Sequence, residues 1–80
     1  MADKEQAAAV VQEIVARIAK REPGELGPDT RLAEDLGLKS VSRIELAALL
    51  EDRLGVEISN FDIRKPGTVG EVVALVQAKM

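Results

Sequence analysis

Apolar residues recur at helical spacing near the start of the chain. One face of a helix with 3.6 residues per turn would be formed by Ala7, Val11, Ile14, Val15 and Ile18. This pattern predicts a first helix over residues 4–21. Asp3 is a candidate N-cap, and Pro23 with Gly24 would stop the helix.

A second apolar pattern predicts a helix over residues 41–54, closed by Gly55 at the C′ position. Ser40 and Ser42 are two candidate caps, and Ser42 with Glu45 has the spacing of a capping box. The expected buried face consists of Ile44, Leu46, Ala47, Leu50 and Leu54. A shorter stripe of Val41, Ile44 and Ala48 lies beside it, so the helix is expected to expose part of one apolar face.

A third pattern follows Thr68, where Thr68 and Glu71 match a capping box. The apolar face of this last helix consists of Val69, Val72, Val73 and Val76. Before it, residues 56–58 read as an extended link. Residues 60–64 read as one helical turn, with Phe61 or Ile63 directed inward.

Between the first two helices, residues 22–39 contain two prolines and three glycines, which predicts a long loop. Four leucines are spaced through it and are expected to pin it onto the helices: Leu26, Leu32, Leu36 and Leu38. No convincing strand pattern is present. The 80 residues therefore predict a single all-α domain over residues 1–80, a small bundle of three main helices plus a short helical turn, with a long first loop.

Composition excludes several kinds of function. The chain has no His, Cys, Trp or Tyr, so it cannot build a thiolate site or a Ser-His-Asp device, and no metal site is expected. Its net charge of −3 gives it no electrostatic reason to bind nucleic acid. No signal peptide or membrane span is evident, and a cytoplasmic location is expected.

One stretch carries candidate chemistry. Asp35-Leu36-Gly37 is followed by Leu38-Lys39, then Ser40 at a helix start, and Glu45-Leu46 one turn further on. A helix N-terminus has free N–H groups and partial positive charge, which suit a phosphate. For an isolated serine in this position, however, a plain helix cap is the simpler interpretation.

This stretch resembles the attachment motif of the acyl carrier proteins and the related peptidyl carrier proteins, and helix order and loop length correspond over most of the chain. The resemblance implies that Ser40 receives a 4′-phosphopantetheine group from coenzyme A, through a phosphopantetheinyl transferase. The thiol of that group would carry an acyl cargo as a thioester. Ser42 lacks the spacing from Gly37, and Ser59 lies outside the motif.

The chain departs from the family at Lys39, where Asp is usual. From Lys39 to Leu54 three basic residues balance three acidic ones, whereas carriers of primary fatty acid synthesis are typically acidic there. Lys39 is either neutral drift on a solvated turn or a sign of changed partner selection. We expect a free-standing, non-enzymatic carrier for polyketide or other natural-product biosynthesis. The alternatives are a peptidyl or aminoacyl carrier of nonribosomal peptide assembly, a fatty-acid carrier, and a small helical interaction module without a prosthetic group.

Partner enzymes are expected to contact an apolar patch with a charged rim, formed by Val41, Ile44 and Ala48 with Lys39, Arg43, Glu45 and Asp52. Beside the transferase, these partners would be an acyltransferase or ligase and synthase enzymes, and the carrier is expected to be a monomer. The remaining apolar residues would form the core and could also line a cleft for cargo: Leu46, Ala47, Leu50, Ile58, Ile63 and Val69.

Overall fold

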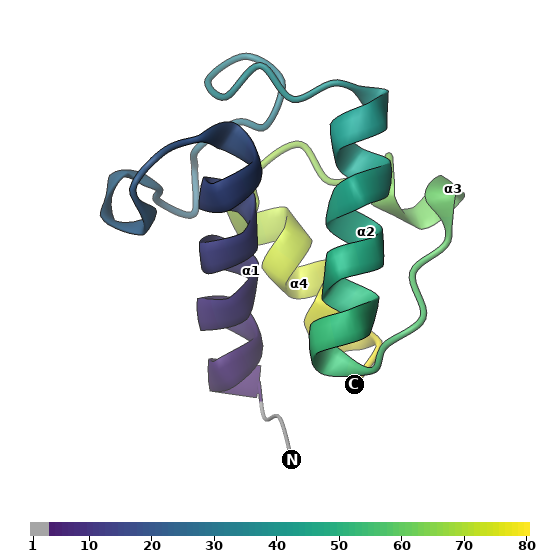
Figure 1. Ribbon diagram of the computed structural model, residues 1–80. Helices are drawn as coiled ribbons and strands as arrows, with labels where there is room; N and C mark the ends of the chain where they lie inside the picture. The colour runs from purple at the N-terminus through teal and green to yellow at the C-terminus, as the bar shows by residue number, and fades with distance from the viewer. Residues whose placement is uncertain (1–3) are drawn as a thin grey trace.

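The computed structural model describes residues 4–80, so the expected cap Asp3 lies outside the described residues. Its elements are α1 (Lys4–Ala19), the short 3₁₀ helix η1 (Pro23–Glu25), α2 (Ser40–Leu54), α3 (Asn60–Ile63) and α4 (Val69–Ala78). Figure 1 shows α1 and α2 side by side, with α4 crossing between them and α3 on the outer side of α2. The described residues form no strand, and the prediction of an all-α bundle is confirmed.

The first helix ends two residues earlier than the apolar pattern predicted. Lys20 adopts a left-handed conformation with φ of 59°. The Arg21 amide donates to the Ala16 carbonyl at 2.9 Å, and the Lys20 amide donates to the Arg17 carbonyl at 3.3 Å. These two bonds form a Schellman motif, which satisfies the last carbonyls of α1 before the chain reaches Pro23.

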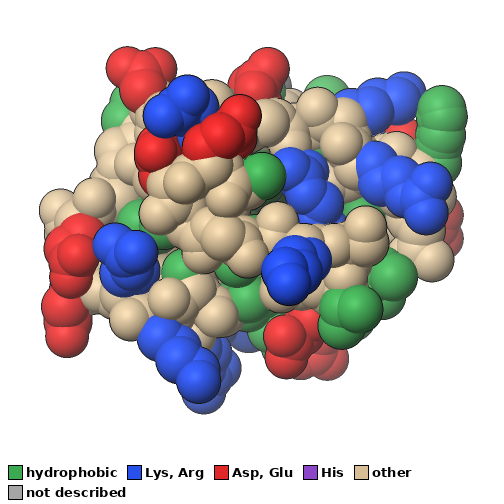
Figure 2. Space-filling view, turned by 90° about the horizontal axis from the view of Figure 1, so that it is seen from above, with side chains coloured by type: hydrophobic (Ala, Val, Ile, Leu, Met, Phe, Trp, Pro, Cys, Tyr) green, Lys and Arg blue, Asp and Glu red, His purple; other side chains and the backbone are tan. Residues whose placement is uncertain are grey.

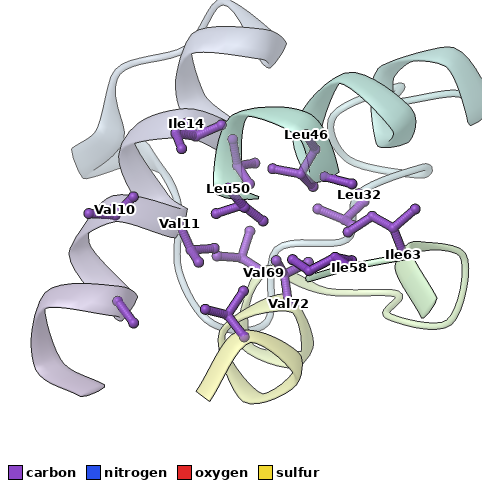
Figure 3. Packing of buried hydrophobic residues seen from close by; sticks show 14 of the residues in the cluster. Val10, Val11, Ile14, Leu32, Leu46, Leu50, Ile58, Ile63, Val69 and Val72 are labelled. Carbon is purple, nitrogen blue, oxygen red and sulfur yellow. The ribbon is translucent and has the colours of Figure 1, made fainter. Parts of the chain in front are cut away.

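The core lies where α1, α2 and α4 meet (Figure 3). The predicted face of α1 is buried except for the half-buried Ile18, and Val10 and Ala16 are buried as well. Leu46, Ala47 and Leu50 of α2 face it, with Val69, Val72 and Val76 of α4. The core is entirely apolar, since no polar or charged residue of the described chain is buried.

The long first loop is fixed onto the bundle by its leucines, as predicted. Leu26, Leu32 and Leu38 are buried, and Leu36 is half-buried. Three backbone hydrogen bonds of 2.9 Å also tie the loop to the start of α4: Leu32 N–H to Gly67 O, Val69 N–H to Thr30 O, and Gly70 N–H to Pro28 O. The loop therefore has a defined path between α1 and α2 (Figure 1).

The approach of the loop to α4 is close enough to require a glycine. A Cβ atom at Gly70 would lie 2.9 Å from the Pro28 carbonyl oxygen, which belongs to the backbone and cannot swing away. The start of α4 is otherwise capped as predicted, because Thr68 Oγ1 accepts from the Glu71 amide at 3.1 Å. The other half of the predicted capping box differs: the Glu71 carboxylate accepts a hydrogen bond from the amide of Gly67 at 2.9 Å, one residue before the cap.

The start of α2 differs from the prediction. Lys39 is the N-cap, in extended conformation, and no side chain caps the helix. Ser42 is the third residue of the helix, so the expected Ser42–Glu45 capping box is wrong. The chain enters the helix directly after the buried Leu38, so Ser40 lies one residue and Ser42 three residues too late to serve as the cap. At the other end Gly55 closes α2 as predicted, with φ of 69°.

Candidate functional site

A tight turn over residues 31–38 delivers the chain to α2. Asp35 Oδ2 accepts from the backbone amide of Arg31 at 2.8 Å, and its carboxylate pairs with the Arg31 guanidinium at 3.2 Å. Gly37 then adopts a left-handed conformation with φ of 67°. The Leu38 amide donates to the Leu32 carbonyl at 2.9 Å, which closes the turn immediately before Lys39. The Asp-Leu-Gly motif thus shapes the turn that leads into α2.

Ser40 is the first residue of α2 and is exposed. The first backbone bond of the helix runs from the Arg43 amide to the Lys39 carbonyl at 3.0 Å. The amides of residues 40–42 precede that bond and point out of the helix end, as the first amides of any α-helix do. An exposed hydroxyl at this end lies in the positive field of the helix, where a phosphate diester is favoured.

The other two serines named by the sequence are placed differently. Ser42 is half-buried within the first turn of α2. Ser59 Oγ accepts from the Asp62 amide at 3.0 Å and caps α3. Of the three hydroxyls, only that of Ser40 combines exposure with a helix start at which no side chain caps the amides.

Most of the residues predicted to contact partners lie on the exposed side of α2. Val41 is 78% exposed and Ile44 is 47% exposed, so the expectation that Ile44 belongs to the buried face is wrong. Both point away from the core because they occupy the side of the helix opposite Leu46 and Leu50. The other exposed members of the predicted set are Lys39, Glu45, Ala48 and Asp52.

A further exposed apolar residue lies on α3, which contacts α2. Phe61 is 62% exposed, whereas Ile63 is buried and fills the inward position of the same turn. The ammonium of Lys65 lies 4.5 Å from the centroid of the Phe61 ring, which is a cation–π contact. The sequence left open which of Phe61 and Ile63 points inward, because one turn is too short to establish a period.

Arg43 makes hydrogen bonds within the chain that the sequence did not predict. Its side chain is half-buried, and Nη1 donates to the carbonyl of Ile63 at 3.1 Å, of Arg64 at 3.5 Å and of Pro66 at 2.5 Å. These contacts join α2 to the segment between α3 and α4. Sequence spacing gives no sign of them, since backbone carbonyls accept regardless of residue type.

Figure 2 views the molecule from above, toward the end at which α2 begins. Lys and Arg side chains lie apart from one another across much of this face, with exposed hydrophobic side chains and Asp or Glu side chains among them. Three exposed basic residues lie near Ser40 or Phe61. Lys39 precedes Ser40 in the chain, Arg64 follows α3, and Lys65 contacts the Phe61 ring. Exposed acidic residues lie on α2, among them Glu45 and Asp52, so the basic residues do not form a patch of one sign.

Two carboxylates at the surface, the exposed Asp35 and the half-buried Asp62, are stabilised in their charged form by neighbours. Hydrogen bonds from the Arg31 backbone and side chain hold the pKa of Asp35 below its ordinary value of 3.8. A hydrogen bond from Lys79, 2.9 Å away, together with bonds from Ser59, lowers the pKa of Asp62 in the same way. Within the described residues no group of His, Cys, Asp and Glu could hold a metal ion, and no helix there is long and apolar enough to cross a membrane.

Comparison with known families gives a match over most of the chain. The family described as "Phosphopantetheine attachment site" matches residues 9–76. That range includes the turn at residues 31–38, all of α2, and α3.

Several curated proteins are similar along nearly the whole chain. The meromycolate extension acyl carrier protein of Mycobacterium tuberculosis is 36% identical over 74 residues, and that of Mycolicibacterium smegmatis is 37% identical over 76. These alignments cover 92% and 95% of this chain, and 64% and 77% of the relatives. The chain thus spans under two thirds of the length of the M. tuberculosis protein. An acyl carrier protein of an Exiguobacterium species is 35% identical over 77 residues, covering 96% of this chain and 98% of its own.

A solved structure has the same fold. A free-standing peptidyl carrier protein from a secondary metabolic pathway of Acinetobacter baumannii superposes with a TM-score of 0.79. The match covers 95% of this chain and 94% of that chain, at 22% sequence identity. At this identity the likeness concerns the arrangement of the helices.

Proposed function

The chain belongs to the family of carrier proteins that bear a phosphopantetheine attachment site, and we propose that Ser40 is the residue to which the group is attached. Its prosthetic group is a covalently bound 4′-phosphopantetheine. The observation that carries the assignment to Ser40 is its position. It is the exposed first residue of a 15-residue helix at which no side chain caps the free amides.

The residues around Ser40 fit a phosphate diester. Ser40 Oγ would supply the oxygen that bonds to phosphorus, and the amides of the first turn of α2 would face the negative charge. Lys39, adjacent in the chain, adds a positive charge. When bound, the group supplies a terminal thiol that holds cargo as a thioester. The chain itself contributes a rigid helix end, because Leu46 and Leu50 fix α2 in the core.

For the cargo, we propose acyl intermediates of polyketide or other natural-product biosynthesis. Support comes from the balance of charge along α2 and from Lys39 before the attachment serine, both of which differ from an acidic carrier surface. A second candidate is acyl-chain extension of the fatty-acid type, favoured by the likeness to the mycobacterial meromycolate extension acyl carrier proteins. In either role the chain is a carrier. Loading and processing of cargo would be done by a transferase, an acyltransferase or ligase, and synthase enzymes.

Intact mass spectrometry tests the attachment site. We expect the wild-type chain, incubated with coenzyme A and a broad-specificity phosphopantetheinyl transferase, to gain the mass of one phosphopantetheine. Ser40→Ala should gain none, whereas the matched control Ser42→Ala should gain the full mass. A gain that survives Ser40→Ala would reject this site. No gain in the wild type would instead favour a helical interaction module without a prosthetic group.

The pathway is tested on the loaded protein. The chain would be isolated from its native host, and the mass and fragmentation of the thioester-bound group determined. A polyketide-type or other specialised acyl group supports the first candidate. A long unbranched alkyl chain supports the second, and an aminoacyl group would reject both in favour of a peptidyl carrier.

A further inference from the structure

Arg43 lies one helical turn after the proposed attachment residue. Residues three apart on an α-helix are neighbours on its surface, so Arg43 occupies the same side of α2 as Ser40. From there its guanidinium reaches the carbonyls of Ile63, Arg64 and Pro66. The segment that follows α3 is thereby held against the first turns of α2.

That segment needs such support because α3 is only four residues long. A single helical turn is not stable alone, and its last carbonyls have no partners inside the helix. Three contacts fix it from outside: the buried Ile63 side chain, the ion pair between Asp62 and Lys79, and the Arg43 guanidinium. Ile63 packs in the core that Leu46 and Leu50 of α2 also join, and Arg43 adds the polar contact between the segment and the helix that carries Ser40.

The segment presents an exposed apolar and basic surface. Phe61 is exposed with the Lys65 ammonium over its ring, and Arg64 is exposed as well. On the other side of Arg43, Val41 and Ile44 are the exposed apolar residues of α2. Figure 1 shows α3 beside α2, on the side away from α1.

An enzyme that modifies Ser40 must cover more than the helix end. A standard interface buries about 800 Å² on each partner, and the whole surface of this chain is 4919 Å². Such an enzyme would cover about a sixth of the molecule around Ser40. Arg43, one turn after Ser40, contacts the carbonyls of Ile63, Arg64 and Pro66, so we expect the segment over residues 61–66 to fall within that area.

We propose that Arg43 is a positioning residue for the modification of Ser40. It holds residues 61–66 against α2, so that Phe61 and Lys65 form, together with Val41 and Ile44, one surface for the phosphopantetheinyl transferase. This inference rests on the proposed function, because it takes Ser40 as the attachment residue. Loss of the guanidinium frees the segment, and the transferase then meets a surface that must be ordered on binding.

Two variants and a control test the proposal. Arg43→Gln removes the charge and most of the reach, whereas Arg43→Lys keeps a donor that can reach carbonyls. Arg53→Gln is the matched control. Arg53 lies on the same helix, thirteen residues and about 20 Å beyond Ser40, and its side chain forms an exposed ion pair with Glu13. All measurements are made well below the melting temperature of each variant, as determined by circular dichroism.

The first measurement is hydrogen exchange of the amides of residues 61–65 and 67, since Pro66 has no amide hydrogen. We expect exchange to become about tenfold faster in Arg43→Gln, with smaller acceleration in Arg43→Lys and none in Arg53→Gln. The second measurement is transferase kinetics with coenzyme A. We expect the KM for the carrier to rise about threefold to tenfold in Arg43→Gln, at nearly unchanged kcat, with partial rescue by Arg43→Lys.

The possible results separate the proposal about Arg43 from the proposal that Ser40 is the attachment site. Faster exchange with an unchanged KM would show that Arg43 serves only the stability of the fold, and would overturn this inference while leaving Ser40 as the site. Unchanged exchange would overturn it directly. A wild-type chain that takes up no phosphopantetheine would instead reject the proposed function. Should Arg43→Gln fail to fold, Arg43→Lys against wild type carries both measurements.

Discussion

Gly37 shows how a single backbone angle controls the entry to α2. Its φ of 67° lies in the left-handed region, and the next residue, Leu38, is buried and bonded to Leu32. A side chain at position 37 would meet no atom within 4 Å, so space is not the constraint. The constraint is the conformation, which costs an L-residue about 1–2 kcal/mol.

We therefore expect Gly37→Ala to lower the free energy of unfolding by about 1–2 kcal/mol, measured by urea denaturation. Gly24→Ala is the matched control, since Gly24 has open space around it and its φ is not positive. The control should change stability by less than about 0.5 kcal/mol or raise it slightly. Equal losses in the two variants would show that the angle at Gly37 is not what requires glycine.

At the scale of elements, the first loop behaves as part of the core. Leu32 is fully buried, and its amide donates to the Gly67 carbonyl at the entrance to α4. Leu36 is only half-buried and packs against the edge of the core. The two leucines are four residues apart in one loop, yet Leu32 is buried in the core and Leu36 lies at its edge.

This difference predicts unequal costs of truncation. We expect Leu32→Ala to destabilise the fold by about 2–5 kcal/mol, because it removes buried contacts and leaves a cavity. Leu36→Ala should cost clearly less, since part of its side chain is already in water. Thermal and urea unfolding of the two variants measure this. Similar losses at both positions would mean that the loop is not anchored through Leu32.

The elements also show what the sequence could predict. The three main helices follow from their apolar periods, and Gly55 marks the end of α2 because only a residue suited to positive φ closes a helix there. The end of α1 was predicted too late because Lys20, an ordinary residue, takes the left-handed position. Its Schellman bonds are made by backbone atoms, which leave no pattern in the side chains.

For the candidate site, the motif around Ser40 could be identified from the sequence, but its surroundings could not. Ser42 and Glu45 have capping-box spacing, yet the buried Leu38 moves the helix start to Ser40. Arg43 has the spacing of a surface residue, and its acceptors are carbonyls twenty or more residues away in the chain. Tertiary contacts of this kind depend on how the helices pack.

At the scale of the whole molecule, the interior is apolar and the ion pairs lie at the surface. No ionisable side chain of residues 5–80 is buried, and the ion pairs lie at the periphery. Asp35 stabilises the turn before α2, and Asp62 joins α3 to the end of α4 through Lys79. Protonation of these two carboxylates therefore weakens the contacts that hold the segments before and after α2.

The sign of the resulting pH dependence follows from the direction of the two shifts. Both pKa values are lowered in the folded chain from 3.8. A lowered pKa means that the folded state holds the charged form more strongly than the unfolded state does. The stabilisation is fully present well above pH 3.8 and is lost as the pH falls through the folded values. With no histidine in the chain, no imidazole adds a transition near neutral pH.

We expect the melting temperature of the wild type, followed by circular dichroism from pH 7 to pH 2.5, to fall most steeply below about pH 4. Asp35→Asn and Asp62→Asn should each lower it at pH 7 and reduce the further loss on acidification, because the titrating group is gone. Asp52→Asn removes an exposed carboxylate of α2 outside these contacts, and should keep the wild-type slope. If Asp52→Asn flattened the profile as much as the other two, acid sensitivity would come from the general charge of the chain and not from the contacts at Asp35 and Asp62.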